Sequence, residues 1–271
     1  MICDRSIVTG PGPVTPVVSQ LVLSVFPGAD LLGRGFEQEG YCVVRGPDIV
    51  WGGDIRHFHA PPGKFTGVIG GSPCQKFSLL NRNRPADGGE GVELLGQFGR
   101  VVLEACPDWF LLENVPTVPS IEVPGYIVQR FNLRASECGG RQRRNRCFQF
   151  GSRDGAPLVV DRSVTEEVTE GAAIASEANR EVRRGFADFC ELQGLPRDFD
   201  LPGLSVEAKY KAVGNGVPVY MARVIAQGVR CRGQSRFERL CVCNCGRPVF
   251  GRSVSATPAC RKRLSRARAA I

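Results

Sequence analysis

Short hydrophobic runs recur along the chain, and each ends at a glycine, a proline or a polar side chain. Runs of four or five residues bounded by such turn signals are typical of buried strands. Between them, apolar residues spaced three or four apart indicate helices. Strands are therefore predicted at residues 22–26, 41–44, 67–70 and 109–112, and helices at residues 31–40, 94–105 and 213–226.

Short strands alternating with helices predict an α/β fold with a mainly parallel sheet. Ligands of such sheets bind beyond the carboxyl ends of the strands. Turn-forming and reactive residues follow those predicted ends: residues 26–28 (Phe-Pro-Gly), Asp54, Cys74 and Glu113. The pattern therefore predicts one ligand site at one edge of the sheet.

The composition is that of an ordinary globular protein, because 42% of the 271 residues are hydrophobic and 23% are charged. No run approaches the 18 apolar residues that a membrane-spanning helix needs. The N-terminus lacks the basic and apolar segments of a secretory signal, so we expect a cytoplasmic protein without a membrane partner. Residues 1–20, with three prolines, are expected to form a flexible leader.

The net charge of +8 is unevenly distributed. Residues 230–271 contain eleven Lys or Arg and one acid, Glu238, so this tail carries +10 and the remainder carries −2. A basic tail of this kind contacts phosphate backbones without reading base sequence. The alternative is a solvated terminal extension.

Four short blocks occur in a fixed order: Gly-Ser-Pro-Cys-Gln at 71–75, Glu-Asn-Val at 113–115, Gln-Arg-Arg-Asn-Arg at 142–146 and Gly-Asn-Gly-Val-Pro at 214–218. Each block alone is weak evidence, but the ordered set resembles the DNA cytosine-5 methyltransferases, as a short member of bacterial or phage type. The resemblance runs from about Leu21 to Val229. It implies a Rossmann-like S-adenosylmethionine-dependent fold, a DNA substrate and a role of the restriction-modification kind.

The resemblance also implies a division of the chain. Residues 21–150 would form the catalytic and cofactor-binding domain, which residues 183–229 complete. Residues 151–182, poor in large apolar side chains, would be a very small target-recognition region, although a plain surface loop fits equally well. Residues 230–271 would be a basic Cys-containing tail.

S-adenosylmethionine is the cofactor that the resemblance implies. The family reads Phe-x-Gly-x-Gly after its first strand, whereas this chain has Asp30 at the second glycine position. The Asp30 side chain can instead cap the following helix. Asp48 is a possible substitute for the acid that the family places against the ribose. By the family pattern, the residues that line the cofactor site are Phe26, Gly28, Asp30, Leu31, Asp54, Ile55, Pro73, Leu94, Asn215 and Val217.

The chemistry that the resemblance implies begins with Cys74 as the nucleophile that adds to carbon 6 of cytosine. Glu113 would hold a proton at ring nitrogen 3, which requires a raised carboxyl pKa. Arg146 would bind the carbonyl oxygen at carbon 2, and Arg144 would hold the site and the neighbouring phosphates. These four residues are the expected catalytic group.

The target carbon is inaccessible inside a duplex, so the base must rotate out of the stack. The polar, glycine-rich segment 75–91 is expected to act as a loop over the flipped base. The residues expected to contact DNA are Gln75, Ser78, Arg82, Arg84, Gln142, Arg261, Lys262 and Arg263.

Four tail cysteines, Cys241, Cys243, Cys245 and Cys260, are a candidate tetrahedral zinc set. They resemble small basic zinc-ribbon tails with altered spacing, since the Cys-x-x-Cys pair is missing and the tail has no histidine. Reduced, unliganded thiols are the alternative.

Two other functions remain open from the sequence. One is a catalytically silent nucleic-acid-binding protein on the same scaffold, which Asp30 favours weakly. The other is an RNA cytosine-5 methyltransferase, because both substrates share the ring chemistry.

Overall fold

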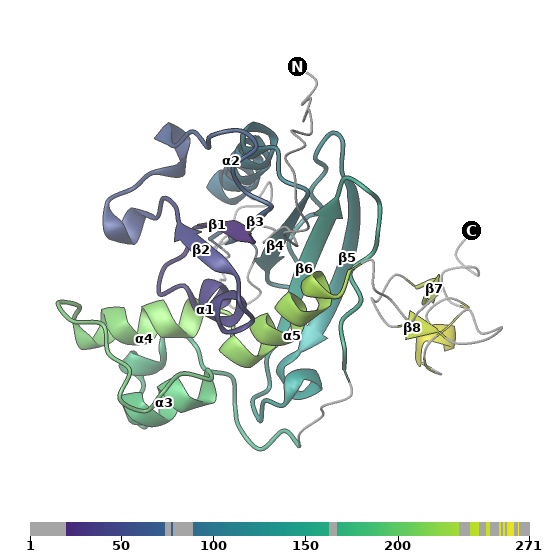
Figure 1. Ribbon diagram of the computed structural model, residues 1–271. Helices are drawn as coiled ribbons and strands as arrows, with labels where there is room; N and C mark the ends of the chain where they lie inside the picture. Colours follow the sequence, from purple (N-terminus) through teal and green to yellow (C-terminus); the bar gives the residue numbers. More distant parts are fainter. Residues whose placement is uncertain are drawn as a thin grey trace, which may run out of the picture.

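The computed structural model describes residues 20–73, 77, 89–162, 167–232, 239–243, 248–249, 255, 257, 259–262 and 265. Within these residues a six-stranded sheet has the order β2-β1-β3-β4-β6-β5 (Figure 1). Five strands run in the same direction and β6 runs antiparallel to both of its neighbours. The strands are β1 (Leu21–Val25), β2 (Cys42–Arg45), β3 (Gly67–Gly71), β4 (Trp109–Asn114), β5 (Ile127–Arg134) and β6 (Asn145–Ser152).

Helices cover both faces of the sheet, so the fold has three layers (Figure 1). Alternate side chains of a strand point to opposite faces: Ile69 packs with α1 and α5, and Val68 packs with α2. A third cluster joins α3, α4 and residues 173–178. The helices are α1 (Leu31–Gln38), α2 (Gly89–Ala105), α3 (Phe186–Leu192), α4 (Val206–Asn215) and α5 (Val219–Arg230).

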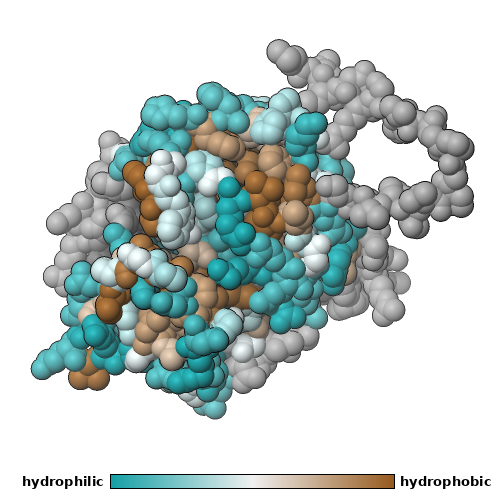
Figure 2. All heavy atoms as spheres, turned by 60° about the vertical axis from the view of Figure 1, so that its left-hand side comes forward, coloured by the Kyte–Doolittle hydropathy of each residue, from teal (hydrophilic) through white to brown (hydrophobic). Residues whose placement is uncertain are grey.

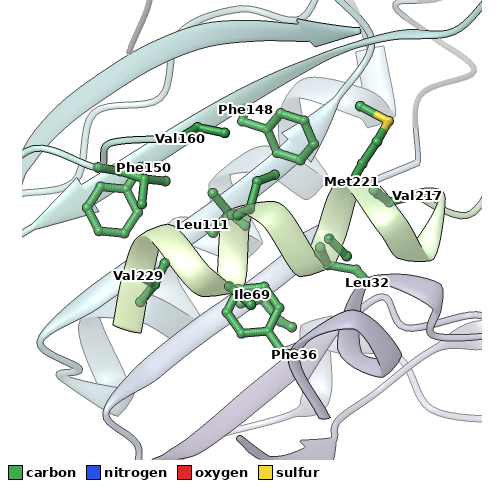
Figure 3. Packing of buried hydrophobic residues seen from close by; sticks show 14 of the residues in the cluster. Leu32, Phe36, Ile69, Leu111, Phe148, Phe150, Val160, Val217, Met221 and Val229 are labelled. Atoms are coloured by element: carbon green, nitrogen blue, oxygen red, sulfur yellow. The ribbon is translucent and has the colours of Figure 1, made fainter. Parts of the chain in front are cut away.

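The core on the first face forms where α1 and α5 cross (Figure 3). Phe36 of α1 and Met221 of α5 belong to the same buried cluster as Ile69 and Leu111 of the sheet. The two helices pack closely because α1 has a glycine at the crossing: a Cβ on Gly35 would lie 2.3 Å from the Ala222 Cβ. This contact holds the last helix of the domain against the first.

The predicted strands and the first two helices are confirmed to within a few residues. The prediction of a single helix over 213–226 is wrong, because the chain forms α4 and α5 with a break at residues 216–218. Pro218, which has no N–H to continue a helix, is the N-cap of α5. The β5–β6 hairpin was not predicted at all.

The segment proposed for target recognition has no α-helix or strand among its described residues 153–162 and 167–182, apart from a 3-10 turn at Glu177–Asn179 and a bridge at Glu170. Its first part is buried in the main core through Leu158 and Val160. The expected leader lies outside the described residues except for Gln20.

Among the described residues, no helix has the length and apolar character needed to cross a bilayer. On the face shown in Figure 2, hydrophilic residues (teal) cover much of the surface and hydrophobic residues (brown) gather in patches between them. A short hairpin of β7 (Arg239–Leu240) and β8 (Pro248–Val249) forms a second sheet in the tail.

Candidate active site

A cavity of about 550 Å³ opens at the carboxyl ends of β1, β3 and β4. Its wall also includes α4 and the turn between α4 and α5, so segments far apart in sequence enclose it. All ten residues expected to line a cofactor site border this cavity: Phe26, Gly28, Asp30, Leu31, Asp54, Ile55, Pro73, Leu94, Asn215 and Val217. Glu113 and Arg146, two of the four expected catalytic residues, border the same space.

The turn between β1 and α1 is wound in the left-handed region. Phe26, Gly28 and Asp30 have φ values of 54°, 54° and 52°. Asp30 fills the position where the family has glycine, and aspartate is one of the few residues that tolerate this conformation. Its carboxylate accepts a hydrogen bond from Gly33 N at 3.0 Å and another from the Ser24 hydroxyl at 2.9 Å. The predicted helix cap is therefore confirmed.

Asp30 has a cationic partner that sequence reasoning missed. Arg45, the last residue of β2, places its Nε 2.9 Å from Asp30 Oδ2 and also contacts Glu37 at 2.8 Å. Burial raises the pKa of the Asp30 carboxyl, while the Ser24 hydrogen bond and Arg45 act in the opposite direction. Serine, arginine and the Gly33 amide together compensate a carboxylate that is only 3% exposed.

Asp48 stabilises the same turn from the other side. Its two carboxylate oxygens accept hydrogen bonds from Gly28 N and Val50 N, both at 2.8 Å. The next residues form a 3-10 turn, Ile49–Trp51, in which the Trp51 indole donates to the Gly28 carbonyl at 2.8 Å. Ile49 is 79% exposed at the cavity. The position of Asp48 after a predicted strand was the only sequence signal for this group.

Asp54 and Ile55 begin a second 3-10 turn on the cavity wall. Asp54 accepts a hydrogen bond from Arg56 N at 2.9 Å, and that bond, followed by the Arg56 side chain, lowers the pKa of the Asp54 carboxyl. Ile55 is buried, and its carbonyl accepts a 2.6 Å hydrogen bond from Arg100 of α2. The turn therefore has a fixed position relative to α2.

Glu113 and Arg146 form an ion pair inside the cavity, with Arg146 Nε 2.9 Å from Glu113 Oε1. Glu113 lies near the end of β4 opposite Gly71, where a Cβ would come within 2.8 Å of Glu113 Oε2, so glycine leaves room for the carboxylate. Burial raises the pKa of the Glu113 carboxyl, partly offset by Arg146 and Arg144. This is the direction that the expected proton-holding role requires.

Asn114 fixes the chain just before the Pro-Cys block. Its side-chain amide donates to both the carbonyl and the hydroxyl oxygen of Ser72, each at 3.0 Å. Beyond the block, Phe77 is buried, and its carbonyl accepts a 2.5 Å hydrogen bond from Thr117. Pro73 lies between these two hydrogen-bonded residues, Ser72 and Phe77, in the chain, and it borders the cavity. Cys74 lies outside the described residues, as do Gln75, Ser78, Arg82 and Arg84.

The expectation that Gln142 contacts DNA is wrong. Gln142 is 1% exposed, and its amide nitrogen donates to the Leu192 carbonyl, the Gln193 side chain and the Tyr220 hydroxyl at 2.8–2.9 Å. Its amide oxygen accepts from Ala173 N at 3.1 Å. A glutamine with its hydrogen-bonding groups engaged inside the fold has no face left for a phosphate.

Arg144 also differs from its expected catalytic role. It is 4% exposed, and its guanidinium donates to the Ala173 carbonyl at 2.7 Å and to the Gly214 and Gly216 carbonyls at 3.1 and 2.7 Å. Arg144 does not border the cavity. It holds the turn after α4 against the sheet, as a positioning residue.

The tail is described only in part. Arg261 and Lys262 are exposed, as phosphate contacts require, and Arg263 lies outside the described residues. Cys241, Cys243 and Cys260 bring their sulfur atoms together, and Cys245 also lies outside the described residues.

Comparison with known families agrees with this geometry. Residues 48–185, about half of the chain, match the family model of C-5 cytosine-specific DNA methylases. The chain therefore belongs to that family. Similarity to solved structures supports the same α/β fold. A prophage-encoded DNA modification methyltransferase of E. coli superposes with a TM-score of 0.58 at 16% identity, over 80% of this chain and 100% of the other. The Entamoeba histolytica methyltransferase EhMeth superposes with a TM-score of 0.59 at 11% identity, over 77% of this chain and 97% of the other.

Among curated proteins, the chain is similar to type II methyltransferases. It is 30% identical to M.XorII of Xanthomonas oryzae pv. oryzae over 193 residues, covering 56% of this chain and 45% of the relative. It is 31% identical to M.SacI of Streptomyces achromogenes over 179 residues, covering 58% of this chain and 43% of the relative. The chain thus spans about half the length of the curated relatives that it matches.

Proposed function

We propose that this protein transfers a methyl group from S-adenosylmethionine to carbon 5 of a cytosine rotated out of DNA, through a covalent adduct with Cys74. The observation that carries the proposal is the ion pair between buried Glu113 and half-buried Arg146, which shares one cavity with all ten expected cofactor-site residues. Pro73, the residue before Cys74, borders the same cavity, so nucleophile, proton holder and cofactor would meet at one edge of the sheet.

The cavity suits the proposed cofactor. Its volume of about 550 Å³ lies within the range of small-molecule sites. Each Asp48 oxygen accepts one backbone N–H, and a carboxylate oxygen has a second lone pair, so Asp48 can still accept from ribose hydroxyls. Asp54 offers an acceptor to the adenine amine, beside the apolar walls of Ile55 and Leu94. When bound, S-adenosylmethionine supplies an electrophilic methyl group on a sulfonium.

The cytosine ring must first become nucleophilic at carbon 5. The Cys74 thiolate forms a bond to carbon 6, and the electron pair of the carbon 5–carbon 6 double bond moves into the ring. Protonation at nitrogen 3 neutralises the negative charge that this addition creates. Carbon 5 then bonds to the methyl group, whose bond to sulfur breaks and leaves S-adenosylhomocysteine. A base, which water can supply, takes the proton from carbon 5, and the Cys74 thiolate leaves as the double bond is restored.

Glu113 supplies the proton at nitrogen 3 in this proposal. Burial favours its neutral form, and the acid needs that form to donate. Arg146 has two roles. Its Nε holds Glu113 in place, and its guanidinium offers further N–H donors to the carbonyl oxygen at carbon 2. The pair therefore recognises cytosine and activates it through adjacent atoms.

DNA contacts are proposed for three parts of the chain. The expected loop over 75–91 is shorter at its end, because residues 89–91 belong to α2. The segment 75–88 would close over the rotated base, with Gln75, Ser78, Arg82 and Arg84 toward the strand. Residues 151–182, which are buried in part through Leu158, Val160 and Ala173, would form the reduced recognition region. The tail would add phosphate contacts through Arg261 and Lys262, both exposed, and through Arg263. A DNA-methylating enzyme of this kind would act in the cytoplasm of its host.

The test is incubation of the full chain with methyl-labelled S-adenosylmethionine and mixed-sequence DNA or RNA, followed by nucleoside analysis. We expect 5-methylcytosine in DNA, none with Cys74→Ser, and an unchanged yield with Cys42→Ser, which alters an exposed thiol on β2. 5-Methylcytosine found in RNA alone would mean that the substrate is RNA and that the proposed DNA substrate is wrong. No product from a folded protein that binds DNA would support the silent binding protein.

A further inference from the structure

The tail contains a cluster of three thiols that the proposed methyl transfer does not use. The sulfur atoms of Cys241, Cys243 and Cys260 all lie within 4.8 Å of one another, and those of Cys241 and Cys243 are 3.3 Å apart. Cys241 and Cys243 directly follow β7, whereas Cys260 lies in the helical stretch 259–262. The fold therefore brings together thiols from two segments separated by 16 residues of chain.

Two of the three thiols are buried and the third, Cys243, is half-buried. Cys241 and Cys260 are 2% and 3% exposed. Among the described tail residues, the hydrophobic cluster consists of cysteines alone. A segment of about 40 residues rarely folds on apolar burial alone and usually needs a metal or disulfides, and a two-stranded hairpin such as β7–β8 is marginal by itself. A cross-link at the sulfur atoms, by a metal or a disulfide, would therefore stabilise the fold of the tail.

The geometry and chemistry of the cluster fit a metal ion. Zinc binds thiolates at about 2.3 Å in a tetrahedral arrangement, which sets ligand sulfurs roughly 3.8 Å apart. The observed separations, from 3.3 Å to at most 4.8 Å, bracket that value. Thiolate ligands select soft or borderline ions such as zinc over magnesium or calcium.

A neighbouring side chain fixes the position of the Cys260 sulfur. The Thr257 hydroxyl donates to the Cys260 sulfur at 3.1 Å, and the Cys260 N–H donates back to the same hydroxyl at 3.2 Å. Arg261 and Lys262 follow Cys260 directly in the chain. A donor to a ligand sulfur also orients it toward the metal.

We propose that Cys241, Cys243 and Cys260 bind one zinc ion, which holds β7 and the helical stretch 259–262 together. The fourth ligand expected from the sequence, Cys245, lies outside the described residues. The metal would fix the position of exposed Arg261 and Lys262 beside Cys260, so the ion would be structural and remote from the methyl-transfer cavity.

The experiment measures metal content of the full chain, purified under reducing conditions without chelator. We expect one zinc per chain by elemental analysis, and after exchange with cobalt(II) a thiolate-to-cobalt charge-transfer band. Cys241→Ser, Cys243→Ser and Cys260→Ser should each lose the zinc or weaken its binding at least tenfold. Cys231→Ser is the matched control, since Cys231 is an exposed free thiol ten residues before the cluster, and it should keep the zinc.

Three results would overturn the proposal: reduced protein that takes up neither zinc nor cobalt, a triple serine variant that keeps its zinc, or cysteines found paired as disulfides in the native protein. Thermal unfolding of each variant, followed by circular dichroism, shows whether the α/β domain is folded. Loss of zinc from a folded domain therefore reports on the tail alone. None of these measurements depends on methyl transfer, so failure of the metal site and failure of the proposed activity are distinguishable.

Discussion

Arg45 Nε lies 2.9 Å from Asp30 Oδ2, so the side chain that replaces a glycine of the family pattern is paired with a cation at the end of the neighbouring strand. The pair connects the start of α1 to β2 at the edge of the cavity. It explains how a buried carboxylate is accommodated where the family has a residue without a side chain.

Replacing Asp30 tests what its conformation and its cap contribute. Asp30→Ala removes the cap, worth about 0.5–2 kcal/mol, and places alanine at a φ of 52°, where a Cβ costs about another 1–2 kcal/mol. Asp30→Gly also loses the cap and the ion pair with Arg45, but glycine tolerates that φ. It should therefore be more stable than Asp30→Ala by at least about 1 kcal/mol. Urea unfolding of both variants measures the difference, and equal stabilities would contradict this account.

Glu113→Gln tests proton donation. Glutamine keeps the shape and can still donate a hydrogen bond from its amide, but it cannot transfer a proton to nitrogen 3. We expect kcat for methyl transfer to fall by about 10²–10⁴-fold, with little change in the Kd for S-adenosylhomocysteine. Single-turnover methylation and calorimetric titration measure the two quantities. A rate within threefold of the unmodified protein would rule out the proton-holding role.

Arg146→Met should move the pH dependence of the reaction. The Glu113 proton is lost as the pH rises through its pKa, so the rate should fall on the alkaline side. Arg146 lowers that pKa by stabilising the carboxylate. Removing its charge raises the pKa, and the alkaline fall of kcat/KM should shift to higher pH, on a lower overall rate.

The control for that shift is Arg143→Met, which removes an exposed arginine that does not border the cavity. Its pH profile should keep the original midpoint. A shift of the Arg146→Met profile to lower pH would contradict the ion-pair assignment.

Arg144→Met should act on stability. The substitution leaves the buried carbonyls of Ala173, Gly214 and Gly216 without their donor, which should cost about 3 kcal/mol or more. Arg143→Met is again the matched control and should change the free energy of unfolding by less than about 0.5 kcal/mol. If Arg144→Met kept full stability but lost activity, Arg144 would have the direct role first expected from the sequence.

Removing residues 233–271 should flatten the salt dependence of DNA binding. The deleted segment contains nine Lys or Arg and one Glu, while Arg232, which pairs with Asp154 at 2.6 Å, is retained.

A double variant, Arg261→Gln with Lys262→Gln, should lower the slope of log K against log salt by about 2, because each phosphate contact contributes roughly 0.9. Binding titrations at several salt concentrations provide the slope, and an unchanged slope would exclude phosphate contacts by these residues.

The cavity was predictable from the sequence because strand ends and ordered motifs point to the same edge of the sheet. Asp30 was correctly expected to cap α1, since its side chain needs only the next turn of helix. Gln142 was misassigned because its partners lie at residues 173, 192–193 and 220, which no local pattern connects to it. The hairpin β5–β6 was missed although β5 alternates in burial along Phe131 and Leu133.

The crossing of α1 and α5 has a consequence for biosynthesis. Residues up to Asn114 supply most of the cavity wall, but Asn215 and Val217 close it, and α5 covers the sheet next to α1. A ribosome that adds about 5–20 residues per second needs roughly 5–20 s to reach Val217 after Asn114. Until α5 emerges, the apolar side chains that it buries beside α1 on this face of the sheet stay uncovered, which is a hazard for aggregation.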